Sequence, residues 1–157
     1  MSLRQVIAED LKAAMKSQSK NRLEVLRMAR ARMQEAEVAL RAEMGRDYEL
    51  SDEESIKVLA AYAKQRRDSI EAYRKAGRED LAAQEEAELA IVQEYLPKQL
   101  GEDEVRAIVK EAIDSTGATS PRQMGAVMKA VMPKVQGAAD GKLISRIVNE
   151  MLSGRTS

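Results

Sequence analysis

The stretch Glu94-Tyr95-Leu96-Pro97-Lys98-Gln99-Leu100-Gly101 divides the chain into two blocks of helical sequence. Pro97 lacks a backbone N–H and biases Leu96 toward extended conformations, so we expect the preceding helix to end here. Three acids follow at 102–104, and negative charge suits the positive end of a new helix. The predicted parts are an N-terminal domain over 1–96, a linker over 97–101 and a C-terminal domain over 102–153.

The N-terminal block shows apolar residues spaced three and four apart, the pattern of helices with one buried face. Ser2 with Gln5 and Ser51 with Glu54 are capping boxes, which mark two helix starts. Gly77 lies between basic and acidic residues and predicts a turn between two further helices. We therefore predict four helices, paired as two antiparallel hairpins.

The C-terminal block predicts three short helices around one small core. The first follows the acidic run after Gly101, the second starts at Ser120-Pro121, and Asp140 can cap the third. Pro133 is expected to stop the second helix. No segment has the alternating pattern of a strand, and aromatic residues make up only 3% of the chain. The predicted fold class is all-α: a four-helix block followed by a three-helix domain.

Composition narrows the possible functions. The chain has 157 residues, 44% of them apolar and 33% charged, with 26 basic and 26 acidic side chains. Histidine and cysteine are both absent, which excludes disulfides and the common nucleophile–histidine catalytic pairs. There is no phosphate-binding glycine loop and no stretch apolar enough to cross a membrane. We therefore assign no catalytic residue, no cofactor and no metal site.

Charge is distributed unevenly along the chain. Residues 116–157 carry six basic and two acidic side chains, a local net charge of +4 in a chain that is neutral overall. At about 100° per residue, Arg122 and Lys129 would share one helix face, and Lys142 and Arg146 another, with Lys134 in the connecting turn. Two interpretations stay open, a surface that binds phosphates and an ordinary solvated surface. The candidate RNA-binding residues are Arg122, Lys129, Lys134, Lys142 and Arg146.

Other features also leave alternatives open. The C-terminal block contains no aromatic residue, so any RNA bound there would be recognised by backbone and shape rather than by base stacking. The acidic run Glu85, Glu86, Glu88 fits a solvated face or a cation site, and methionines at 124, 128 and 132 fit core packing or a partner groove. Arg66 and Arg67 interrupt an apolar stripe and are candidates for an interface edge.

Three motifs, in the same order along the chain, resemble the YqeY-like family. They are Lys75-Ala76-Gly77-Arg78-Glu79-Asp80-Leu81, Glu94-Tyr95-Leu96-Pro97-Lys98-Gln99-Leu100, and Met124-Gly125-Ala126-Val127-Met128-Lys129 with Met132-Pro133 and Gly137-Ala138-Ala139-Asp140-Gly141-Lys142. The C-terminal half of that family is similar to the tail domain of GatB, the B subunit of the tRNA-dependent amidotransferase. The resemblance implies an all-helical, two-domain, cytoplasmic protein with a tRNA-contacting role in translation. The family is associated with carbon–nitrogen ligase activity that uses glutamine as amido donor, but the resemblance covers only the tail, so no catalytic residue is transferred.

Three functional hypotheses follow. The first is an accessory module that binds tRNA, and the second is an adaptor that docks on an amidotransferase or aminoacyl-tRNA synthetase through its N-terminal helices. The third, an independent enzyme, is disfavoured by the missing histidine, cysteine and nucleotide motifs. Glu9 and Asp10 near the start are atypical of a targeting peptide, so we expect a cytoplasmic protein. We also expect no membrane partner and no preference for DNA.

Overall fold

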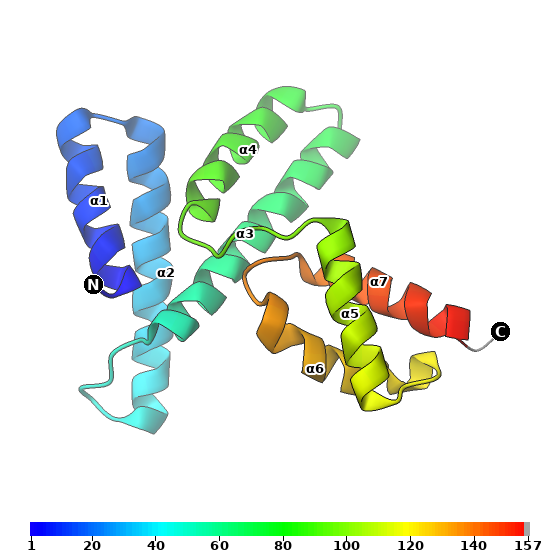
Figure 1. Ribbon diagram of the computed structural model, residues 1–157. Coiled ribbons are helices and arrows are strands. Elements are labelled where there is room, and N and C mark those ends of the chain that lie inside the picture. The colour runs from blue at the N-terminus through cyan, green and yellow to red at the C-terminus, as the bar shows by residue number, and fades with distance from the viewer. Residues whose placement is uncertain (156–157) are drawn as a thin grey trace. The chain divides into compact units, whose positions relative to one another are not determined.

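The structure is a computed structural model that describes residues 1–155, and its secondary structure is helical throughout, with no strand among those residues. This confirms the all-α prediction. The chain divides by its internal contacts into two compact units, residues 1–97 and residues from 98 onward. Figure 1 shows the course of the chain through the helices of each unit.

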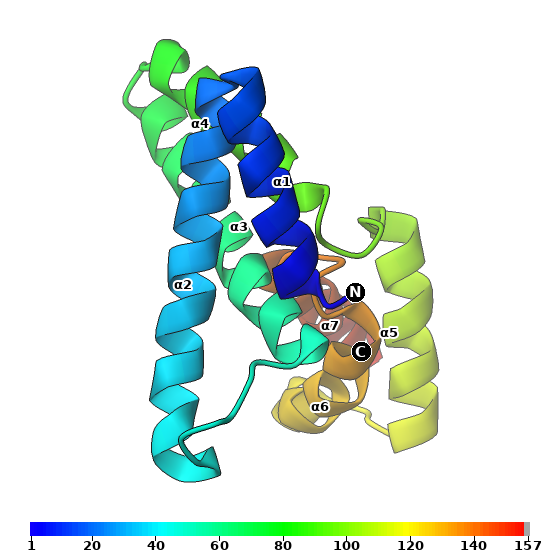
Figure 2. The same cartoon turned by 90° about the vertical axis from the view of Figure 1, so that its left-hand side faces the viewer.

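Unit 1 consists of two helical hairpins. The first pairs α1 (Leu3–Ser17) with α2 (Lys20–Met44), and the second pairs α3 (Asp52–Lys75) with α4 (Glu79–Gln93). Figures 1 and 2 both show α1 lying along α2. Both predicted capping boxes are formed, with Ser2 capping α1 and Ser51 capping α3. Gly77 has a φ of 73°, the left-handed conformation that lets the chain turn tightly into α4.

The core of unit 1 gathers the apolar stripes of all four helices. Burial of this apolar surface is the main force that holds the hairpins together, because each helix alone leaves its stripe in water. The side chains with at most 3% exposure include Ile7, Val25, Leu26, Met33, Leu59, Tyr62 and Val92.

Unit 2 is a three-helix arrangement of α5 (Glu102–Thr116), α6 (Met124–Val135) and α7 (Gly141–Arg155), with a 3₁₀ turn at Pro121–Gln123 before α6. Gly117 ends α5 in the left-handed conformation, with a φ of 69°. The core is formed by β-branched residues and leucine that are fully shielded from solvent. They are Val105, Val109, Ile113, Val127, Val131, Val135, Ile144, Ile147, Val148 and Leu152.

Two expected helix ends are wrong. Helix α4 stops at Gln93, before Pro97, because residues 94–96 form tighter bonds to carbonyls three residues back, such as Tyr95 N–H to Val92 O at 3.1 Å. Pro133 does not stop α6, which continues through it to Val135. Pro133 has no N–H to donate to a carbonyl in the preceding turn, so the helix loses one hydrogen bond near its end and can still continue.

Candidate nucleic-acid interface

All five predicted RNA-binding side chains lie in unit 2 and are exposed, but they do not form one cluster. Arg122 is in the 3₁₀ turn, Lys129 and Lys134 are in α6, and Lys142 and Arg146 are in α7. A helix rises by about 1.5 Å per residue, so the start and end of α6 are about 18 Å apart. The cations therefore follow the length of α6 and continue at the start of α7.

Arg122 and Lys129 are the two predicted cations best suited to bind a phosphate. Within residues 1–155 neither has an ion-pair or hydrogen-bond partner, and both are exposed. The reason given for their shared helix face is wrong, however. Arg122 precedes α6 in a 3₁₀ turn, so a constant α-helical angle does not connect the two positions.

Lys134 lies in the last turn of α6, and not in the connecting turn as predicted. It follows Lys129 by five residues, which rotates it by about 140° around the helix. Its Nζ lies 3.9 Å from Oε1 of Glu111 on α5, at the margin of an ion pair. Lys134 and Lys129 thus point in different directions, and part of the charge of Lys134 is offset by Glu111.

Arg146 belongs to a network of four charges between α5 and α7. Arg106 contacts Glu102 at 2.9 Å and Glu150 at 3.0 Å, and Arg146 contacts Glu150 at 3.1 Å and Glu102 at 3.4 Å. The hydrogen bond from Arg106, together with the charge of Arg146, holds the pKa of Glu102 below its usual value. Arg146 is therefore balanced by carboxylates, which makes it a weaker candidate for a phosphate contact than Arg122 or Lys129.

The loop between α6 and α7 is stabilised from within. The Lys142 N–H donates to the Asp140 carboxylate at 3.2 Å, so Asp140 caps α7 as predicted. The carboxylate occupies the position that an external anion would take at this helix end. The exposed Lys142 side chain, rather than the backbone, is what this loop offers a phosphate.

The sequence reasoning missed Lys98. Gln99 Nε2 donates to the carbonyl of Gly137, and the Leu100 N–H donates to the carbonyl of Ala138, both at 2.8 Å. These bonds hold the segment containing exposed Lys98 beside the α6–α7 loop. Two of the quoted motifs contain these partners, but their contact is long-range and nothing in the sequence pairs them.

Arg66 makes its contacts within unit 1. It contacts Glu85 at 2.6 Å and Glu88 at 3.2 Å on α4, and it stacks over the Tyr62 ring at 5.1 Å. Its partners are largely shielded from solvent, so the acidic run of α4 is not simply a solvated face. Within residues 1–155, no group of three or more histidine, cysteine or acidic side chains is arranged to hold a metal ion.

The structure thus defines an all-helical protein of two units, the second of which presents basic side chains along α6 and the start of α7. None of the helices in residues 1–155 combines the length and apolar character that crossing a bilayer requires. The chain belongs to the YqeY-like family: the family model described as "Yqey-like protein" matches residues 4–152. It is also 30% identical, over 150 residues, to a fungal protein named "Altered inheritance of mitochondria protein 41, mitochondrial" from Pyrenophora tritici-repentis. That match covers 93% of this chain and 78% of the fungal protein.

Proposed function

We propose that this protein is an accessory module that binds tRNA through its phosphates, with unit 2 as the binding unit. Arg122 and Lys129 carry the proposal, because they are exposed cations with no partner in residues 1–155. Lys142 and Lys98 extend the surface to the α6–α7 loop, whereas Lys134 and Arg146 contribute less because acids face them.

Recognition in this proposal uses shape and charge rather than base stacking. All four tyrosines lie in unit 1, and the chain has neither phenylalanine nor tryptophan. Without aromatic platforms, unit 2 lacks the side chains on which splayed bases usually stack. Affinity is accordingly modest, falls steeply with salt and differs little between tRNA species.

We also propose that this protein is related to the tail domain of GatB and works in the cytoplasm, as the family resemblance implies. The protein has no catalytic role in this proposal, and any amidotransferase chemistry belongs to a separate enzyme. The word "mitochondrial" in the name of the fungal relative describes that protein.

The direct test is a fluorescence-anisotropy titration of labelled total tRNA with the full chain over a range of salt concentrations. With about three phosphates neutralised, the logarithm of affinity should fall with the logarithm of salt at a slope of about −2 to −3. Arg122→Glu with Lys129→Glu should weaken binding by at least about tenfold at low salt, because two contacts become repulsive.

A matched control changes the same charge in unit 1. Lys12→Glu with Lys20→Glu alters two exposed lysines of α1 and α2 and should change affinity by less than about twofold. Equal losses in the two variants, or a loss only in the control, would move RNA binding away from unit 2. A duplex DNA arm should show weaker binding than tRNA, because both present phosphates but only tRNA has the shape that the proposal requires.

The adaptor hypothesis concerns unit 1, where four large apolar side chains are exposed by about half: Met15 at 54%, Met28 at 46%, Val38 at 57% and Met44 at 60%. They are spread over α1 and along α2, and singly exposed apolar residues are common on protein surfaces, so they do not define a docking patch by themselves. Absence of tRNA binding by the unaltered chain at low salt would favour this second function.

A further inference from the structure

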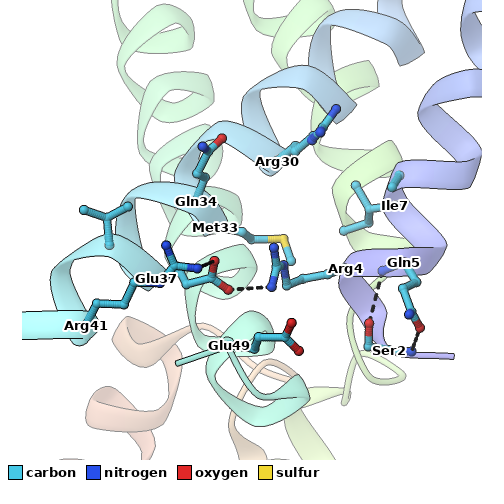
Figure 3. A pocket seen from close by; sticks show the side chains of 12 residues that line it. Ser2, Arg4, Gln5, Ile7, Arg30, Met33, Gln34, Glu37, Arg41 and Glu49 are labelled. Carbon is cyan, nitrogen blue, oxygen red and sulfur yellow. Dashed lines mark hydrogen bonds and ion pairs between the residues drawn. The ribbon is translucent and has the colours of Figure 1, made fainter. Parts of the chain in front are cut away.

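A pocket in unit 1 has the features of a small-molecule site. It lies against α1 and α2 and reaches Glu49 in the segment before α3, with a volume of about 410 Å³. Figure 3 shows the side chains that line it, including Arg4 from α1 and Arg30 and Arg41 from α2. Ile7 and Met33, both buried, supply an apolar part of the lining.

Glu37 organises the polar side of this pocket. Its side chain is only 4% exposed, and it accepts hydrogen bonds from Arg4 Nη1 at 2.5 Å, Arg41 Nη2 at 2.8 Å and the Leu50 N–H at 2.9 Å. Arg41 Nε also donates to the Tyr48 carbonyl at 3.1 Å. A guanidinium has more N–H groups than these bonds use, so both arginines are fixed in place while keeping donors for a ligand.

The pocket has a surplus of positive charge. Arg4, Arg41 and Glu37 together carry one net positive charge, and Arg30 adds a third guanidinium to the lining. Arg30 is exposed and has no ion-pair or hydrogen-bond partner in residues 1–155. Glu49 is the one further acid that lines the pocket, which leaves a net charge of +1. A planar guanidinium matches the geometry of carboxylate and phosphate oxygens.

A second, shallow depression on α2 lies next to the pocket. Gln34 and Val38 line both features, and Ala31, Glu35 and Ala39 complete the shallow second one. Val38 is 57% exposed and is the largest apolar side chain in this depression. A ligand that spanned the two would place a charged group beside Arg30 and an apolar group against Val38 on α2.

We propose that this pocket binds an amphipathic small molecule with an oxyanion head and an apolar body. Arg30 receives the head, a carboxylate or a phosphate, while Arg4 and Arg41, held by Glu37 further along α2, add positive charge to the same pocket (Figure 3). Val38 and the neighbouring alanines contact the body. The site is separate from the proposed RNA surface and does not depend on it.

The test uses octyl phosphate and octanoate as probes, below their micelle concentrations, with the full chain. Isothermal titration calorimetry gives affinity, and amide shifts in ¹⁵N–¹H NMR spectra give location. We expect binding with the largest shifts around Arg30, Gln34 and Val38. Inorganic phosphate, which lacks the body, and octyl glucoside, which lacks the charge, should each bind at least about tenfold more weakly.

Two single variants of α2 distinguish binding in the pocket from nonspecific attraction of the probes to positive charge. Arg30→Gln should weaken the charged probes by about tenfold or more, and Arg27→Gln, an exposed arginine outside the lining, by less than about twofold. The ratio between octyl phosphate and octanoate identifies the preferred head. Equal binding of octyl glucoside, equal losses in the two variants, or shifts confined to other surfaces would overturn the proposal.

Discussion

Glu37 carries a charge into the interior of unit 1, where only 3% of the residue is exposed. A buried carboxylate is tolerated when its hydrogen bonds and charge are matched, here by Arg4, Arg41 and the Leu50 amide. The contact with Arg4 joins α1 to α2, and the hydrogen bond from Leu50 joins the segment before α3 to α2. The residue thus fixes three parts of unit 1 around the pocket.

Replacing Glu37 by alanine should lower the free energy of unfolding by about 1 to 3 kcal/mol, because it removes two charge-assisted hydrogen bonds and leaves the buried Leu50 amide without its acceptor. Urea denaturation followed by circular dichroism measures the change. Glu35→Ala, two residues along the same helix at an exposed position, is the control and should stay within about 0.5 kcal/mol of the unaltered protein. A loss no larger than that of the control would show that the three contacts of Glu37 contribute little.

For single residues, the sequence correctly predicted which charged side chains are exposed, but it did not predict which groups they contact. The spacing of Glu102 with Arg106, and of Arg146 with Glu150, allows ion pairs along a helix. The contacts that join these pairs across α5 and α7 depend on packing and have no local signal. For this reason Arg146 was predicted as a phosphate contact although two carboxylates already surround it.

At the scale of elements, the start of a helix was easier to predict than its end. The boxes at Ser2 and Ser51 combine a side-chain cap with a glutamine or glutamate three residues later, and both are formed. At Ser120 half of the box is present: the Gln123 side chain accepts from the Ser120 N–H at 3.3 Å, but the Ser120 hydroxyl makes no cap. Where a helix ends depends on how far its side chains pack against the rest of the protein, which a local sequence pattern does not show. Pro133 therefore lies inside α6, and α4 stops before Pro97.

The contact between α3 and α4 predicts a pH effect. Burial and the nearby charge of Glu85 raise the pKa of Glu88 above its usual value, although Arg66 acts in the opposite direction. The folded chain therefore binds a proton at Glu88 more readily than the unfolded chain does. As pH falls from 7 through that raised pKa toward the ordinary value of 4.5, this group adds stability.

Glu88→Gln removes this titration but keeps an oxygen for Arg66. The free energy of unfolding of the unaltered protein, minus that of the variant, should increase between pH 7 and pH 5 in urea titrations. A difference that stays constant, or that shrinks as the pH falls, would show that Arg66 dominates the environment of Glu88.

At the scale of the whole molecule, the all-helical class could be predicted because apolar spacing and caps are local signals. The pocket of unit 1 could not, because it joins residues 2–8 with residues 30–41 through the packing of two helices. The placement of Lys98 beside the α6–α7 loop has the same origin. The predicted division into domains at 96 and 102 stays a prediction, and the structure suggests where to test it.

Limited proteolysis with trypsin should cut first after Lys98, at the Lys98–Gln99 bond. Pro97 and Lys98 are exposed and lie between the end of α4 and the start of α5. Mass spectrometry of a brief trypsin digest should find early fragments that end at Lys98. Early cleavage within α2 or α3 instead would contradict the division into two stable units.

The central claim is that unit 2 contacts tRNA phosphates through exposed lysines and arginines. Lysine acetylation of the full chain, with and without tRNA at low salt, tests it most directly, with mass spectrometry reporting the modification of each lysine. We expect tRNA to protect Lys98, Lys129 and Lys142 by about threefold or more, while Lys12 and Lys16 of α1 react unchanged. Protection confined to Lys12 and Lys16, or no protection of any lysine at a tRNA concentration that saturates binding, would contradict it.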